Sequence, residues 1–207
     1  MATEIDICNM ALAYLGDRAT LASIDPPEGS PQADHCARFY PIAKGQILAE
    51  YPWSFALKRA KLARLAVTPE GAKYAFALPQ DSARVVSIVD TQSNFELHDY
   101  RLESYNGYVI VTCDRDDIYV NYVSALTSEA VFPAPFADAL AHLLASKLAG
   151  PMVPGNSGAK LAQEEMKIYL AFLEKAINHD AVQTHERELY KCPFVGDLSL
   201  GGHYGYN

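Results

Sequence analysis

Residues 132–149 read FPAPFADALAHLLASKLA, and this stretch decides the fold. Its apolar side chains recur at helical spacing: Phe136, Leu140, Leu143, Leu144 and Leu148. This spacing predicts a helix that begins at Pro135 and that the Gly150-Pro151 pair stops. The residues directly before it have strand patterns, while the N-terminal part of the chain is helical. This helix therefore shows that the strands are inserted between helices.

The N-terminal part of the chain contains two further helical patterns. The first helix runs from about Thr3 to Leu15, and Thr3 with Asp6 has the spacing of a capping box. The second helix runs over residues 31–51 after a serine cap. Pro41 lies inside it, which predicts a kink or a break at that position.

Between residues 73 and 124 the pattern changes to alternating or short apolar runs, which are typical of strands. Five strands are predicted: Tyr74–Leu78, Arg84–Asp90, Phe95–Leu102, Tyr108–Cys113 and Ile118–Ser124. Asn106-Gly107 is the type of dipeptide that closes a two-residue hairpin. Parallel strands need long crossover connections, so links this short predict an antiparallel sheet.

After an aperiodic loop over residues 151–158, the longest helix runs from Ser157 to about Asn178. The predicted fold class is therefore α+β: a helical bundle of about four helices with an inserted antiparallel β-sheet and an extended C-terminal tail. We divide the chain into a helical bundle domain of residues 1–65 and 132–190, an inserted β domain of residues 66–131, and a docking tail of residues 191–207.

The composition favours some classes of function over others. The chain has 207 residues and a formal net charge of −8, which disfavours nucleic-acid binding because phosphate neutralisation dominates that affinity. Its 13 tyrosines are typical of partly exposed surfaces that contact other proteins. No signal peptide, membrane span or paired-cysteine spacing is recognisable, so we expect reduced, buried thiols in the cytoplasm of some cell and no membrane association.

Residue types that carry catalysis or bind metals form no recognisable site in this sequence. The six histidines are dispersed, and His179 and His185 do not share one helix face. The acidic run over residues 114–117 is interpreted as a solvated turn, and Glu164-Glu165 as a solvated helix face. We expect no catalytic residue, no cofactor and no metal ion, and hence no enzyme.

Basic residues cluster in one place, where we expect a turn or two of helix: Lys58, Arg59, Lys61 and Arg64. A solvated face is favoured there over a site for phosphate or an acidic partner. The C-terminal tail also stands out, because several apolar side chains lie among glycines: Phe194, Val195, Leu198, Leu200, Tyr204 and Tyr206. Either they pack back on the domain or they dock on another chain, and we favour docking.

Ordered stretches between residues 9 and 151 carry a resemblance to a known family. They are Asn9-x-Ala11-Leu12-x-x-Leu15-Gly16, Ala37-Arg38-x-Tyr40, Pro52-Trp53-Ser54-Phe55-Ala56, Phe76-Ala-Leu78-Pro79-x-Asp81, Val120-Asn-Tyr122 and Phe132-Pro133-x-x-Phe136-x-x-Ala139-Leu140-x-x-x-Leu144. In this order and spacing they resemble the tail tubular protein A family of short-tailed bacteriophages. Its members are also called gatekeeper or head-to-tail adaptor proteins.

The resemblance implies a virion protein of the tail and neck, assembled in the bacterial host cytoplasm. It implies a homo-oligomeric ring, a dodecamer, that binds the portal protein, extends the DNA channel and presents a platform for the tail nozzle and, in some phages, for tail fibres. Genomic DNA passes through without specific binding. The family's C-terminal tail reaches toward the portal, which assigns the apolar residues between Phe194 and Tyr206 to portal docking.

Elementary physics agrees with that role. A closed ring needs two different contact faces on each subunit. Twelve copies with a charge of −8 each would repel DNA from the channel wall.

Three other interpretations stay open. The chain could be an adaptor or head-completion protein of a long-tailed phage or a gene transfer agent, whose helical core is similar. An enzyme with an unrecognised site would have a concave pocket with convergent polar side chains. A nucleic-acid-binding regulator would have a basic face centred on Lys58, Arg59, Lys61 and Arg64.

Overall fold

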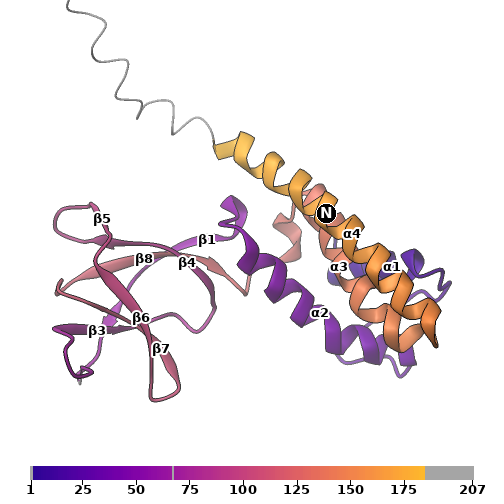
Figure 1. The fold of residues 1–207 in the computed structure, drawn as a ribbon, viewed down its shortest axis with the longest axis horizontal. Helices are drawn as coiled ribbons and strands as arrows, with labels where there is room; N and C mark the ends of the chain where they lie inside the picture. The colour runs from indigo at the N-terminus through magenta and orange to yellow at the C-terminus, as the bar shows by residue number, and fades with distance from the viewer. Residues whose placement is uncertain (1, 67, 185–207) are drawn as a thin grey trace, which may run out of the picture.

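A computed structural model describes residues 2–66 and 68–184, in which four α-helices accompany two antiparallel sheets (Figure 1). The predicted α+β fold class is confirmed. The helices are α1 (Glu4–Tyr14), α2 (Pro31–Glu50), α3 (Ala134–Met152) and α4 (Asn156–Thr184). Two short 3-10 helices, η1 (Ser54–Ala56) and η2 (Glu129–Val131), flank the strands. Figure 1 shows the sheets beside the helices, with the strands inserted between α2 and α3.

Capping side chains start the first two helices as predicted. The Thr3 hydroxyl accepts a hydrogen bond from the Asp6 N–H at 3.1 Å, and the Thr3 N–H donates to the Asp6 carboxylate at 2.9 Å. The bond from the Thr3 N–H, together with one that the Thr3 hydroxyl donates to the same carboxylate at 2.8 Å, holds the pKa of Asp6 below its usual value. The Ser30 hydroxyl likewise accepts from the Ala33 N–H at 3.2 Å. One free N–H group in each of the two first turns therefore has a local partner.

Prolines interrupt neither α2 nor α3. The sequence predicts a kink or a break at Pro41, but α2 continues through it without a break: the proline is exposed, while Tyr40 and Ala43 stay buried. α3 continues through Gly150 and Pro151 to Met152, so the loop that follows is shorter than expected. A proline in the last turn is compatible with the helix, which the rest of α3 already holds in place by burial.

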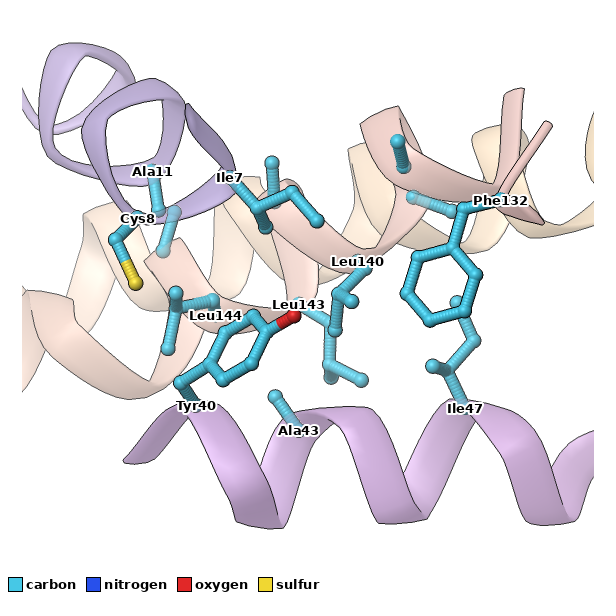
Figure 2. Packing of buried hydrophobic residues seen from close by; sticks show 14 of the residues in the cluster. Ile7, Cys8, Ala11, Tyr40, Ala43, Ile47, Phe132, Leu140, Leu143 and Leu144 are labelled. Atoms are coloured by element: carbon cyan, nitrogen blue, oxygen red, sulfur yellow. The ribbon is translucent and has the colours of Figure 1, made fainter. Parts of the chain in front are cut away.

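Helix α3 forms the centre of the helical part. Every residue from Ala139 to Ser146 is buried, which covers two full turns on all sides. Figure 2 shows side chains of α1, such as Ile7, and of α2, such as Ala43, pointing at Leu140 and its neighbours on α3. Helix α4 packs along α3 through Tyr169 and Ala176. The other three helices together therefore bury α3 in a largely apolar environment.

The strands form two four-stranded sheets instead of the single sheet expected. The strands are β1 (Leu57–Lys61), β2 (Ala63–Arg64), β3 (Tyr74–Ala77), β4 (Ser82–Asp90), β5 (Glu96–Leu97), β6 (Tyr100–Tyr105), β7 (Tyr108–Cys113) and β8 (Ile118–Ser124). One sheet has the order β1-β8-β4-β5 and the other β2-β3-β7-β6, and every pair is antiparallel. Their facing sides share a second core that includes Phe76, Ile88, Val111 and Val120.

Local turn chemistry explains the hairpin between β6 and β7. Asn106 and Gly107 have φ values of 51° and 82°, which is the left-handed conformation that a type I′ turn needs at both central residues. Tyr105 and Tyr108 pair directly on either side of this turn. The predicted two-residue hairpin turn at Asn106-Gly107 is therefore confirmed. The expected strand over residues 95–102, by contrast, is divided into β5 and β6.

Polar contacts join the β part to the helices at one place. Arg84 of β4 donates from Nη1 to the carbonyl oxygens of Ala49 and Glu50, at 2.9 and 2.8 Å, at the end of α2. The Asp180 carboxylate of α4 accepts from the hydroxyl and the N–H of Ser54, at 2.6 and 3.1 Å. Since both carbonyls at a helix end otherwise lack partners, these bonds fix where the β part begins.

The turn between α3 and α4 gives a direct test of this packing. A Cβ on Gly158 would lie 2.1 Å from the Val153 carbonyl oxygen and 2.9 Å from that of Ala149. We expect Gly158→Ala to lower the free energy of unfolding by at least about 2 kcal/mol, measured by urea denaturation, because backbone atoms must move apart. The control is Gly150→Ala, where nothing lies within 4 Å. Equal stability of the two variants would contradict the described α3–α4 turn.

Candidate interaction surfaces

The basic cluster lies on strands, and the expectation of a helix there is wrong. Lys58, Arg59 and Lys61 belong to β1, which pairs with β8, and Arg64 belongs to β2, which pairs with β3. We call residues 57–64 the basic edge, because β1 and β2 are the outermost strands of their sheets. The consecutive cations conceal the alternation by which a strand is recognised, which explains why the sequence pattern missed these strands.

Each cation of the basic edge contacts a neighbouring side chain. Lys58 Nζ lies 3.0 Å from an Asp81 carboxylate oxygen, and Lys61 Nζ lies 2.7 Å from one of Asp117. The guanidinium of Arg59 stacks 4.7 Å from the Tyr119 ring centroid, and that of Arg64 lies 4.2 Å from the Tyr74 centroid. The two lysine side chains are still 49% and 57% exposed, whereas their partners Asp81 and Asp117 are 17% and 32% exposed. The outward charge of this edge is therefore positive.

Asp81 connects the basic edge to the neighbouring strand β8. Its carboxylate accepts from the Ser124 hydroxyl at 2.7 Å, from Lys58 at 3.0 Å and from the Tyr122 hydroxyl at 3.1 Å. The bond from Ser124, with those from Lys58 and Tyr122, holds the pKa of Asp81 below its ordinary value of 3.8. Burial and the bond to Asp81 raise the pKa of Tyr122. Asp81 thus acts as an ionised structural acceptor.

The opposite side of the β part is acidic. We call residues 95–103 the acidic edge: they contain β5 and the start of β6, which end their sheets on the side away from β1 and β2. Glu96, Asp99 and Glu103 carry three carboxylates against the single guanidinium of Arg101. The Phe95 side chain beside them is exposed over 75% of its surface. Sequence reasoning missed this surface, because its position opposite the basic edge follows from strand pairing alone.

Apolar side chains gather at the tip of the β6–β7 hairpin. Leu102, Tyr108 and Val109 are exposed large side chains, and the latter two directly follow the Asn106-Gly107 turn. Together with Leu78 they line a groove that runs between this hairpin and the start of β4. Two consecutive exposed apolar residues after a turn were visible in the sequence and could have indicated this surface.

The most deeply buried polar pair lies in the helical part. His142 Nδ1 and a Glu165 carboxylate oxygen are 2.7 Å apart, between α3 and α4, so the interpretation of Glu165 as part of a solvated face is wrong. The His142 ring also stacks on Tyr14 of α1, with centroids 4.1 Å apart. Because His142 lies on α3, Glu165 on α4 and Tyr14 on α1, the pair joins three helices.

The remaining sequence candidates are distributed as follows. Cys8, Cys36 and Cys113 are buried free thiols, and burial raises the pKa of Cys113. Within residues 2–66 and 68–184, no three His, Cys, Asp or Glu side chains are grouped so that they could hold a metal ion. The predicted docking residues Phe194, Val195, Leu198, Leu200, Tyr204 and Tyr206 lie outside the described residues, as does His185.

Comparison with models of known protein families finds no match for this chain, and comparison with curated proteins finds none. The surfaces described above are therefore interpreted from their own chemistry. Among the described residues, no helix combines the length and the apolar content that crossing a membrane requires.

Acid titration tests the role of Asp81. A depressed folded-state pKa contributes stability above the unfolded value, and this stability is lost as the pH falls below about 3.8. We expect Asp81→Asn to lower the free energy of unfolding at neutral pH by about 1–3 kcal/mol. The difference from the wild type should shrink on acidification, as measured by urea denaturation. Asp116→Asn in the exposed β7–β8 turn is the control. A difference that is constant with pH would contradict the account.

Proposed function

We propose that this chain is a subunit of a head-to-tail adaptor ring in a short-tailed bacteriophage. The ring would bind the portal protein, extend the DNA channel and present a platform for the tail nozzle and, in some phages, for tail fibres. The observation that carries the proposal is the placement of the resembling stretches. Trp53 from one of them and Phe136 and Leu140 from another are fully buried in one core.

The architecture supports the proposal. The resemblance implies a helical bundle that carries an inserted β-structure, and the chain has its sheets inserted between α2 and α3. Trp53 contacts Phe136 with ring centroids 4.9 Å apart, so a motif before the insertion packs on a motif after it. These two motifs therefore close the helical part around its insertion.

Surface charge also supports a channel component. The chain has a net charge of −8, so a ring of twelve copies would carry a charge on the order of −100. The basic edge, which favours the competing role of a nucleic-acid-binding regulator, has two of its lysines in ion pairs with Asp81 and Asp117. Phosphate contacts at those lysines would have to replace these pairs, which lowers the gain from binding DNA.

The portal provides the direct test of this function. We expect the purified full-length chain, mixed with the portal protein of the same phage, to form rings seated on the portal, seen by electron microscopy and light scattering. Duplex DNA should not bind measurably at physiological salt, because the chain is acidic. A chain that stays monomeric with portal present would contradict the proposal. Salt-sensitive binding to DNA would favour the regulator, and attachment to a long-tailed phage connector the adaptor of that class.

A separate prediction concerns the tail. Deleting residues 193–207 should abolish portal attachment and leave the thermal unfolding midpoint unchanged, because the two cores lie within residues 2–184. A full-length variant with Phe194, Leu198 and Tyr204 changed to Ser tests the same claim without shortening the chain. It should show the same loss of portal attachment. Attachment by the truncated chain at wild-type affinity would show that portal docking lies elsewhere.

A further inference from the structure

The β part has two unlike sides, which the strand orders define. β1 and β2 follow each other through Leu62 and end their respective sheets on one side. β5 and β6 are likewise consecutive and end the same two sheets on the other side. The basic edge and the acidic edge therefore lie on opposite sides of one small β structure.

Both sides have unused backbone hydrogen-bonding capacity. Among the described residues, β1 pairs only with β8, and β6 pairs only with β7. An outermost strand of five or six residues with a free outer edge is a template for pairing with another chain. Natural proteins discourage such pairing with charges of one sign, and here the two edges carry charges of opposite sign.

The charges are complementary. Residues 57–64 contain four cations and no carboxylate, while residues 95–103 contain three carboxylates and one guanidinium. Because the carboxylates of Asp81 and Asp117 pair with Lys58 and Lys61, the net charges are +2 on the basic edge and −2 on the acidic edge, with His98 neutral. Each edge also exposes apolar surface, through Leu57 on the basic side and through Phe95 and Leu102 on the acidic side. Like edges repel each other, so only the unlike pairing is favourable.

We infer that the partner of the basic edge is the acidic edge of a second copy of this chain. A contact between two different surfaces is heterologous, and it repeats from copy to copy until a ring closes. This inference rests on the proposed adaptor ring and specifies which strands meet in it. Backbone pairing and the exposed apolar side chains supply affinity, and the charges determine orientation and partner.

Reciprocal charge reversal tests the contact. The basic-edge variant is Arg59→Glu with Arg64→Glu, at two arginines that lie over tyrosine rings; Arg59 also donates from Nη2 to Asn94 Oδ1 at 3.2 Å. The acidic-edge variant is Glu96→Lys with Asp99→Lys, at two exposed residues. The matched control, Lys160→Glu with Lys167→Glu, makes the same charge change as the basic-edge variant on the exposed surface of α4. Thermal unfolding establishes that all three variants fold.

The readout is the mass of the assemblies by light scattering, with and without the portal protein. We expect each edge variant alone to need on the order of tenfold more protein for half-maximal assembly, while the control assembles like the wild type. Mixing the two edge variants in equal amounts should restore assembly. Counting Asp81 and Asp117 with the lysines they pair with, the basic-edge variant carries a net charge of −2 on each edge and the acidic-edge variant +2 on each edge, so alternating copies match. Raised salt should weaken wild-type assembly.

Wild-type assembly by both separate edge variants would overturn the inference, as would a mixture that fails to recover. Such results would not contradict the adaptor function if rings still attach to the portal. Conversely, rescue by mixing in assemblies that never attach to the portal would support the edge contact and contradict the proposed function. The two claims therefore fail in distinguishable ways.

Discussion

Burial of α3 on every side is the constraint on which the rest of the structure depends. A helix with two turns buried on all sides is stable only when other helices surround it. α1 and α2 precede the strands and α4 follows α3, so segments from both ends of the described chain must cover one helix. The chain that forms the strands between α2 and α3 must therefore leave the helical part and re-enter it near the same point.

This closure explains the residues at the junction. Trp53 fills the space beside Phe136 and donates from its indole nitrogen to the Ile47 carbonyl at 2.8 Å, directly before the chain enters β1. Arg84 and Asp180 bind backbone or hydroxyl groups at the same place. Since the β part contacts the helices mainly here, its outer strands remain available for contacts with other molecules.

Local rules predicted much of this fold. The Thr3–Asp6 capping box, the Asn106-Gly107 turn and the antiparallel pairing all follow from short-range chemistry. The residue pattern did not indicate β1, because Lys58, Arg59 and Lys61 interrupt the alternation that marks a half-buried strand. The residue pattern also did not show that the strands form two sheets instead of one, because pairing between distant strands depends on how both cores pack.

The candidate surfaces were less predictable for the same reason. The basic cluster was visible in the sequence, but its ion pairs with Asp81 and Asp117 join residues 23 and 56 positions apart. Glu165 looked solvated because its partner His142 lies on another helix. The acidic edge could not be identified from the sequence, because strand pairing is what places it opposite the basic edge. The docking prediction for the tail concerns residues beyond Thr184, and it stays a prediction.

The central claim is that copies of this chain meet edge to edge in a ring, and hydrogen exchange tests it most directly. Amide exchange of the wild-type chain would be compared between monomer and portal-bound assembly by mass spectrometry. The account predicts new protection in residues 57–64 and 95–105, because backbone N–H groups of β1 and β6 gain partners. Assemblies in which these two segments exchange as fast as in the monomer would contradict it.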